Sequence, residues 1–414
     1  MTHSIGYRLQ ARLGRIGEAG GYTAAASGKG AKLSEMDWQA GVFEKGTAAS
    51  ASRFLRGEPM LQAPGPDSMG VVWPVKALVA GSVRYSDRAD FSHASVLHLA
   101  RSGQILRDGA VLALRLVGLK PDTRYYYRTE TRYGREDTEL GVLHSFRTAG
   151  DAFASGGMSF AVINDMAGNT ELTARAMQAA AALKPTVTIW NGNMLKALDD
   201  RVQATNGFLL PVKGGESASV PVLYVPGPCD CRGAWSEHLS DVMLARSEGE
   251  RDIRFDRLRY CFALRFGDTA LIGLDAGESA GRDAGLLADF ASYRDLQTEW
   301  LGRELRRADI ASARQLVAFV SRPLTGGAPW QKAWGRLLTS AGAKLVVSAD
   351  AAAYHAEATP ADGRSWLQVV GAGAAEGKAT LICGKTDGAG RLSVTVRDVQ
   401  TGRVLTEMTA AARA

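Results

Sequence analysis

The chain has 414 residues, of which 46% are hydrophobic and 22% are charged. This composition is typical of folded globular proteins and excludes a chain that is disordered throughout. The formal net charge is +6, but 49 basic and 43 acidic residues are interspersed, so we expect no nucleic-acid partner. The sequence contains no run of about 18 apolar residues, and we expect no segment that spans a membrane.

The four cysteines and the N-terminal residues give little information on the cellular compartment. Cys229 and Cys231 lie too close in sequence for an easy mutual disulfide, and no Cys-x-x-Cys pair predicts a zinc site. The N-terminus has spaced arginines but no continuous apolar stretch, so it is not typical of a secretory signal. The compartment therefore stays open.

Residues 1–54 are rich in Gly, Ala and Ser and are predicted to form an N-terminal arm rather than a unit with its own core. An arm with so little apolar content would be ordered most easily by contact with another protein. We therefore expect a protein partner, which the arm could contact.

Residues 55–150 are predicted to form a small antiparallel β-sandwich. Short apolar runs are separated by turn residues, and Leu112, Leu114 and Leu116 alternate with Ala113 and Arg115 as in a half-buried strand. Strands of this length at this spacing are typical of sandwiches.

Several segments of this region resemble a fibronectin type III-like domain, of the kind that precedes the catalytic domain in purple acid phosphatase relatives. The resemblance depends on the runs Pro59–Gln62, Ser68–Trp73, Gly118–Tyr127 and Ser145–Thr148. Such a domain indicates fold far better than function.

Residues 157–408 show a different pattern, in which apolar strands alternate with helices. The predicted strands are Phe160–Ile163, Val187–Trp190, Val222–Val225, Ala270–Leu274, Leu316–Val320 and Lys344–Val347. Glu171–Leu183 and Arg294–Arg307 are typical of helices. This alternation predicts an α/β domain, whose functional residues are expected in the loops at the strand ends.

The order of these loops resembles the calcineurin-like metallophosphoesterase superfamily. The loops are 164–169, 191–194, 227–230, 321–323 and 348–352, with matching flanks that include Asp275, Glu278 and Trp300. Together with the sandwich, the resemblance covers about residues 55 to 400. It implies a four-layer α/β/β/α domain that follows the fibronectin type III-like sandwich, and a site with two metal ions.

The resemblance also implies metal ligands at defined positions, and most of these positions carry other residues here. Asp165 keeps the first aspartate, whereas Ala167 stands in place of the histidine that follows it. Asn193 stands in place of the bridging aspartate, a swap that removes a negative charge. Pro228 and Cys229 take the place of an Asn-His pair.

The remaining ligand positions differ as well. Ser321 takes the place of a lone histidine, and Asp350 and Ala352 take the places of the histidines in a Gly-His-x-His motif. Only two of the six histidines, His238 and His355, lie in the α/β region, and neither falls at a ligand position. Two dications against so few ligands would be strongly unfavourable. We therefore expect no cofactor, no metal ligand and no catalytic residue.

The altered loops are predicted to form a vestigial pocket of ten residues. These are Asp165, Ala167, Asn193, Pro228, Cys229, Asp230, Ser321, Arg322, Asp350 and Ala352.

Three hypotheses for function follow. The first is a catalytically inactive metallophosphoesterase-like protein, a pseudoenzyme that acts as a structural or binding component through protein–protein contacts. The second is a divergent phosphoesterase that hydrolyses phosphate mono- or diesters with a rebuilt single-metal site. The third is a pocket that binds a phosphate ligand without hydrolysis, since Arg232 and Arg322 flank two of the altered loops.

Overall fold

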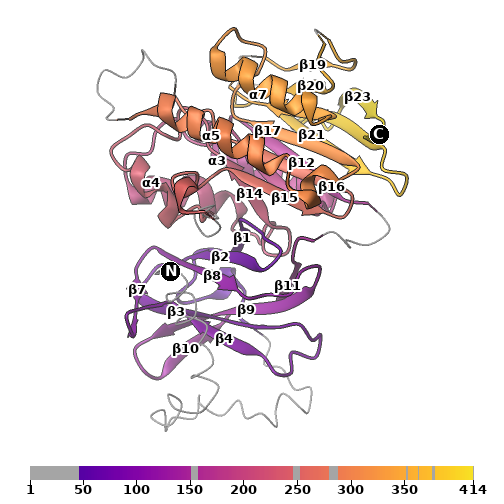
Figure 1. The fold of residues 1–414 in the computed structure, drawn as a ribbon. Helices are drawn as coiled ribbons and strands as arrows, with labels where there is room; N and C mark the ends of the chain where they lie inside the picture. The colour runs from indigo at the N-terminus through magenta and orange to yellow at the C-terminus, as the bar shows by residue number, and fades with distance from the viewer. Residues whose placement is uncertain are drawn as a thin grey trace. The chain divides into compact units, whose positions relative to one another are not determined.

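The computed structural model describes residues 46–150, 157–245, 252–278, 288–350, 353–361, 363–374 and 378–413. The chain divides into two compact units. The first comprises Met1–Thr148 and Val212–Pro221, and the second comprises Ala149–Pro211 and Val222–Ala414 (Figure 1). The short segment Val212–Pro221 thus groups with the first unit, although in the sequence it lies between two strands of the second, Val187–Asn191 and Val222–Val225.

The first unit is built from antiparallel strands. One group pairs in the order β1 (Met60–Gln62), β2 (Ser68–Pro74) and β8 (Val111–Val117). The other has the order β10 (Asp137–Leu140), β9 (Arg124–Tyr133), β3 (Val79–Ser86) and β4 (Ser95–His98), with β11 (His144–Arg147) on β9 and β7 (Arg107–Asp108) on β3. A small pair, β5 (Ala100–Arg101) and β6 (Gln104–Ile105), completes the unit.

The core of this unit lies between the two groups of strands. The expected alternation holds in β8, where Leu112, Leu114 and Leu116 are buried. They pack in one cluster with Trp73 and Tyr127. Trp73 also donates a hydrogen bond from Nε1 to Thr131 Oγ1 at 3.1 Å, so its one polar atom is satisfied in the core.

The predicted N-terminal arm is described only from residue 46 onward. Thr47 N donates to Leu140 O at 2.7 Å, and Arg53 forms two hydrogen bonds to Asp137, so residues 46–53 follow the edge strand β10. This contact covers an edge whose backbone groups would otherwise be open to pairing with another chain. Residues 1–45 of the arm lie outside the described residues.

The second unit contains two mixed sheets. The first consists of β14 (Val222–Val225), β13 (Val187–Asn191) and β12 (Ser159–Asn164), which are parallel, followed by antiparallel β21 (Thr380–Thr386), β22 (Leu392–Asp398) and β23 (Val404–Ala410). The second has the order β15 (Phe262–Phe266), β16 (Thr269–Leu274), β17 (Gln315–Val320), β18 (Leu345–Ser348), β20 (Leu367–Val370) and β19 (His355–Glu357).

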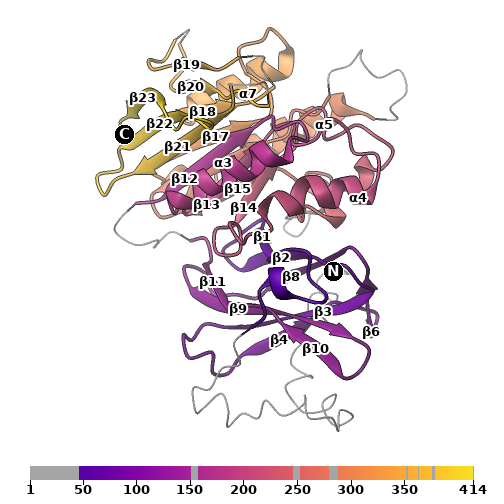
Figure 2. The ribbon, with the colours of Figure 1, turned by 180° about the vertical axis from the view of Figure 1, so that it is seen from behind.

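Helices cover the outer faces of these sheets. α3 (Thr170–Ala182) packs on β12 and β21 of the first sheet. α5 (Phe290–Glu304) and α7 (Pro329–Ser340) pack on the second, as Figures 1 and 2 show from opposite sides. Short helices α4 (Arg201–Ala204) and α6 (Ala308–Ala311) lie in connections.

The two sheets face each other across a shared apolar core. Phe160 and Val162 of β12 lie in one buried cluster with Phe319 of β17 and Val347 of β18. The order helix, sheet, sheet, helix is the four-layer α/β/β/α arrangement, so the predicted fold class is confirmed. The sequence patterns did not predict β21–β23 or α7. Within the described residues, no helix is both long and apolar enough to cross a membrane.

Candidate functional site

The loops of the vestigial pocket follow the carboxyl ends of five strands, β12, β13, β14, β17 and β18. These strands are parallel within each sheet, so their ends meet at one edge of the second unit. Two buried asparagines tie the edges together. Asn164 Nδ2 donates to Asn191 O and Ser348 O at 3.2 and 3.3 Å, and Asn191 Nδ2 reaches Val320 O and Val347 O at 3.4 and 3.3 Å.

Five side chains beyond these asparagines form what we call the strand-end cluster: Asp165, Asn193, Cys229, Arg322 and Asp350. Asn193 lies at its centre. Its Nδ2 donates to Asp165 Oδ1 at 2.9 Å and to Asp350 Oδ1 at 3.2 Å, and its Oδ1 accepts from Cys229 N at 2.7 Å. A backbone N–H can only donate, so the amide oxygen has to face Cys229 and the amide hydrogens have to face the two carboxylates.

Asp165 is held by two donors and is partly shielded from water. Besides the Asn193 amide, Asp350 N donates to Asp165 Oδ2 at 2.7 Å. Burial raises the pKa of Asp165 to about 7, and the charge of Asp350 raises it further while these hydrogen bonds oppose the shift. The backbone of Asp165 and Asp350 is left-handed, with φ of 50° and 55°. Such a conformation is costly for residues other than glycine and persists only where the surroundings enforce it.

Arg322 supplies the positive charge of the cluster. Its Nε lies 3.1 Å from Asp350 Oδ2, and both side chains are about 30% exposed. The preceding Ser321 is buried and bonds elsewhere, because its Oγ accepts a hydrogen bond from Ala276 N at 3.0 Å. The Arg322 guanidinium thus lies against the Asp350 carboxylate and balances its charge.

Cys229 contacts a second arginine. Arg232 lies with one guanidinium nitrogen 3.6 Å from Cys229 Sγ, and its Nε donates to Glu278 Oε2 at 2.6 Å. Burial raises the pKa of the Cys229 thiol, although Arg232 opposes this. A thiol with a raised pKa stays protonated near neutral pH and is a poor nucleophile.

Asp230 connects the loop after β13 with its own loop after β14. It is fully buried and accepts hydrogen bonds from the backbone N–H groups of Met194, Leu195 and Gly227 at 3.1, 2.8 and 3.0 Å. Burial raises its pKa to about 6, while these donors favour the charged form. All three donors are backbone N–H groups of neighbouring loops, so Asp230 holds these loops together.

Solved structures of known proteins are similar in fold to most of the chain. No family model and no curated protein matches the sequence. The solved structure of purple acid phosphatase PPD1 from yellow lupin (Lupinus luteus) seeds has a TM-score of 0.64 at 12% identity, covering 86% of this chain and 75% of that one. The structure of PhoD has a TM-score of 0.59 at 12% identity, covering 84% of this chain and 91% of that one.

The chain has the metallophosphoesterase fold. The fold recognition made from the strand-end loops is thereby confirmed. Identities this low show the fold alone and transfer no activity.

Two of the remaining predicted pocket residues, Ala167 and Pro228, lie beside the cluster, and neither side chain has an atom that could bind a metal ion. Ala167 N donates to Asn193 O at 2.9 Å, which joins the first two loops. Pro228 is buried next to Cys229. Ala352 lies outside the described residues. The structure thus brings together Asp165, Asn193, Cys229, Arg322 and Asp350, and it gives Asp230 and Ser321 partners of their own.

Sequence reasoning missed three residues that shape this site. Asn164 and Asn191 link the sheets, and a polar residue at the end of an otherwise apolar strand run was the available signal. Buried Arg294, on α5, donates to the backbone carbonyls of Ala276 and Glu278 at 2.9 and 3.0 Å and so holds the loop that carries Glu278. No local pattern distinguishes it from other helix arginines.

The residues of this edge do not fit a two-metal centre. Within the described residues, no group of three or more His, Cys, Asp or Glu side chains could hold a metal ion. The group at the bridging position, the Asn193 amide, directs hydrogens toward Asp165 and Asp350, whereas a metal ion requires lone pairs.

Proposed function

We propose that this chain is a catalytically inactive protein with a metallophosphoesterase fold, which acts as a structural or binding component through protein–protein contacts. The observation that carries the proposal is the Asn193 amide, which donates to both Asp165 and Asp350. These hydrogen bonds do for the two carboxylates what bridging metal ions would do in a phosphoesterase: they bring them together and satisfy their oxygens.

The positive charges around the cluster support the same proposal. Arg322 is paired with Asp350 and Arg232 with Glu278, so each guanidinium already has a carboxylate partner. An active site of this fold needs an activated water, and generating it near neutral pH is the task of the metal ions. Cys229, the only thiol of the cluster, has a raised pKa and offers no substitute nucleophile.

The alternative is a phosphoesterase with a rebuilt single-metal site. It draws on the fold and on the proximity of Asp165 and Asp350, whose oxygens are ligands that Mg²⁺ accepts. A metal between them would have to turn the Asn193 amide and displace Arg322 from Asp350. A non-hydrolytic phosphate ligand would likewise have to compete with carboxylates for both arginines.

The decisive experiment is metal analysis combined with an activity assay. The purified full chain is examined by inductively coupled plasma mass spectrometry, and hydrolysis of an aryl phosphate and an aryl phosphodiester is measured with Mn²⁺, Fe²⁺, Zn²⁺ and Mg²⁺. We expect metal far below one equivalent and no turnover above the blank. Stoichiometric metal that is lost in Asp165→Ala, together with activity that disappears with it, would establish the rebuilt site instead.

The binding role needs a separate test. We propose that the full chain, isolated under native conditions from the cells that make it, carries a stoichiometric protein partner. Lysine cross-linking should then join Lys29, Lys32 or Lys45 of the N-terminal arm to that partner. Isolation of the chain as a lone monomer, without such cross-links, would contradict the proposed contact.

A further inference from the structure

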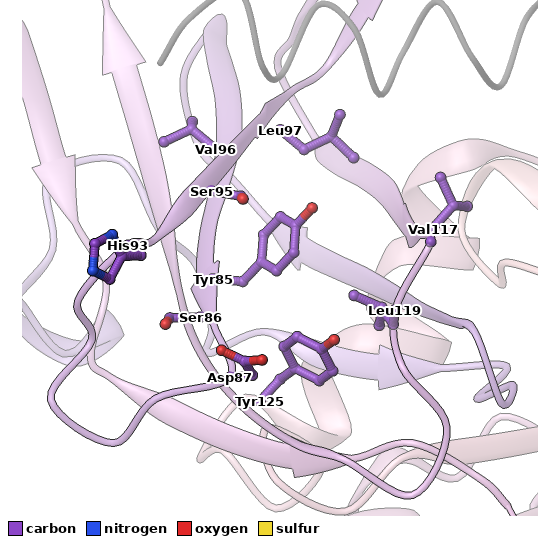
Figure 3. Close-up of a pocket in the computed structure, with 11 residues that line it drawn as sticks. Tyr85, Ser86, Asp87, His93, Ser95, Val96, Leu97, Val117, Leu119 and Tyr125 are labelled. Carbon is purple, nitrogen blue, oxygen red and sulfur yellow. The ribbon is translucent and has the colours of Figure 1, made fainter. Parts of the chain in front are cut away.

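A cavity of about 260 Å³ lies in the sandwich unit, far in sequence from the strand-end cluster (Figure 3). It opens where β3 and β8 end and β4 begins. Its lining comes from residues 85–87, His93, residues 95–97, residues 117–119 and Tyr125. We call it the sandwich pocket.

Two tyrosines form the apolar part of this pocket. The rings of Tyr85 and Tyr125 lie with centroids 6.3 Å apart and planes tilted by 55°, and Figure 3 shows both within the ring of lining residues. Tyr125, Leu97 and Leu119 are buried in the core behind the cavity. The pocket therefore presents aromatic surface that can be covered by an apolar face of a ligand.

The polar groups of the sandwich pocket keep hydrogen-bonding capacity. The Tyr125 hydroxyl accepts from Lys120 N at 3.0 Å, which leaves its hydrogen for donation. Asp87 binds Lys120 Nζ through Oδ2 at 2.7 Å, which leaves Oδ1 as an acceptor. Within the described part of the chain, the Ser95 hydroxyl and the His93 ring have no hydrogen-bond partner. The pocket thus offers donors and acceptors together, unlike the strand-end cluster.

The charges at the rim select against ions. An anion would meet the Asp87 carboxylate, and a cation would meet the Lys120 ammonium that already occupies it. The neighbouring Arg88 and Asp90 also pair with each other. A neutral ligand that carries several hydroxyl groups on an apolar frame matches these conditions better than either kind of ion.

The rim of the pocket is fixed before any ligand arrives. Phe91 and His93 have φ of 55° and 51°, which is a left-handed backbone. This conformation is unfavourable in free energy for residues other than glycine, so the contacts of the loop have to hold it. Phe91 is 1% exposed, with the Arg128 guanidinium 5.7 Å from its ring centre, and Ser86 Oγ donates to Ser92 O at 2.7 Å. A rim held in this way loses little entropy on binding.

We propose that the sandwich pocket binds one neutral sugar ring. The C–H face of the ring packs against the tyrosines, and its hydroxyls bond to Asp87, His93 and Ser95. The volume suits a single ring rather than a chain buried end to end. This site is independent of the proposed loss of catalysis in the other unit, because none of its residues belongs to the strand-end cluster.

Saturation-transfer-difference NMR on the full chain tests this site, with D-glucose, D-galactose, D-mannose and N-acetyl-D-glucosamine as probes. We expect saturable binding of at least one of them. Because a hydrogen bond to a charged group is worth more than a neutral one, Asp87→Asn should weaken binding about tenfold and His93→Ala about fivefold. His238→Ala, an exposed histidine of the second unit, is the matched control and should bind as the wild type does.

Both rim variants replace exposed side chains, so their melting curves should match the wild type and loss of folding can be excluded. The proposal would be overturned if none of the four sugars gave saturable binding, or if the rim variants bound as well as His238→Ala. It would also be overturned if a lysine hexapeptide bound instead and lost its affinity in Asp87→Asn, since the pocket would then recognise a cation.

Discussion

The strand-end cluster and the sandwich pocket both gather polar side chains, but they satisfy them in opposite ways. In the cluster, Asn193, Asp165, Asp350 and Arg322 bond to one another. In the pocket, Ser95 and His93 face a cavity and find no partner within the described residues. A polar group that is satisfied internally costs little to bury, whereas an open one gains from a ligand. Whether the polar atoms of a site already have hydrogen-bond partners is therefore a better guide to ligand binding than the position of the site in the fold.

The response of each unit to pH gives the largest expected contrast. In the second unit, burial raises the pKa of Asp165 to about 7 and those of Asp230 and Asp275 to about 6. Between the ordinary pKa of 3.8 and these values, the folded state keeps protons that the unfolded state has released. Stability therefore falls as pH rises from 5 to 8. Since one unit of pKa is worth about 1.4 kcal/mol, Asp165 alone accounts for about 3 kcal/mol of this loss between pH 5 and its pKa of about 7.

The sandwich unit should behave differently. Pairing lowers the pKa of Glu58 and of Glu130, so their contributions are lost only as pH falls through the acid range. Burial lowers the pKa of His98 on β4, so this residue makes the sandwich unit more stable as pH rises through the ordinary histidine range. Hydrogen exchange, corrected for intrinsic rates, should therefore show protection of β12 decreasing from pH 5 to 8 while protection of β9 does not decrease. Equal loss in both strands, or none in β12, would remove the contrast. Asp230→Asn should make the decline in β12 shallower.

Asn193→Asp is expected to have the next largest effect. It replaces an amide that donates to two carboxylates by a third carboxylate, and it leaves Asp165 and Asp350 facing a like charge. We expect the free energy of unfolding of the second unit to fall by about 3 kcal/mol at pH 8, measured by urea titration with a probe in that unit.

Asn169→Asp is the matched control for this change. Asn169 caps α3 by accepting from Leu172 N at 3.0 Å, and an aspartate caps a helix equally well. The free energy of unfolding of Asn169→Asp should stay within about 0.5 kcal/mol of the wild-type value. If Asn193→Asp were as mild as this control, the central amide would not be holding the carboxylates together.

The Arg232–Glu278 pair should have a moderate effect. Glu278 is 6% exposed at its side chain, so removing its partner leaves a carboxylate that is largely shielded from water. Arg232→Met keeps the aliphatic stem and should cost about 1–2 kcal/mol, measured in the same urea titration. A change near zero would indicate that the arginine contributes packing rather than charge.

The smallest effect is expected at the sandwich rim. Lys120 is 72% exposed, and exposed ion pairs contribute little. Lys120→Ala should leave the melting temperature unchanged. It should strengthen sugar binding, because both oxygens of the Asp87 carboxylate are then available to accept hydrogen bonds from the sugar. A lower melting temperature would show that the Lys120–Asp87 pair stabilises the unit, and that Asp87 is not free to exchange Lys120 for a ligand.

The sequence predicted the elements whose patterns are local. Val222–Val225 was predicted as a strand and is β14 with the same bounds, and Val187–Trp190 is β13 but for one residue. The second long helix was predicted to begin at Arg294, whereas α5 begins at Phe290 because Asp289 caps it by accepting from Ser292 N. The loops of the site were found in the correct order because each follows an apolar strand.

The pairing within those loops could not be predicted, because it depends on contacts between distant residues. The orientation of the Asn193 amide is set by the N–H of Cys229, and Arg232 meets Glu278 across a separation of 46 residues. Asp230 was placed in the pocket from its position alone, and only the fold shows it bonded to three backbone N–H groups. The sandwich pocket had no sequence signal, since its residues come from five separate stretches of the chain.

The most direct test of the proposed loss of the metal site is anomalous diffraction from crystals of the full chain soaked in Mn²⁺. We expect no anomalous peak at the ends of β12, β13 and β18, with Asn193 still within hydrogen-bond distance of Asp165 and Asp350. A peak between the two carboxylates, with the Asn193 amide turned away and Arg322 displaced, would contradict it and would restore a metal-dependent phosphoesterase as the best explanation.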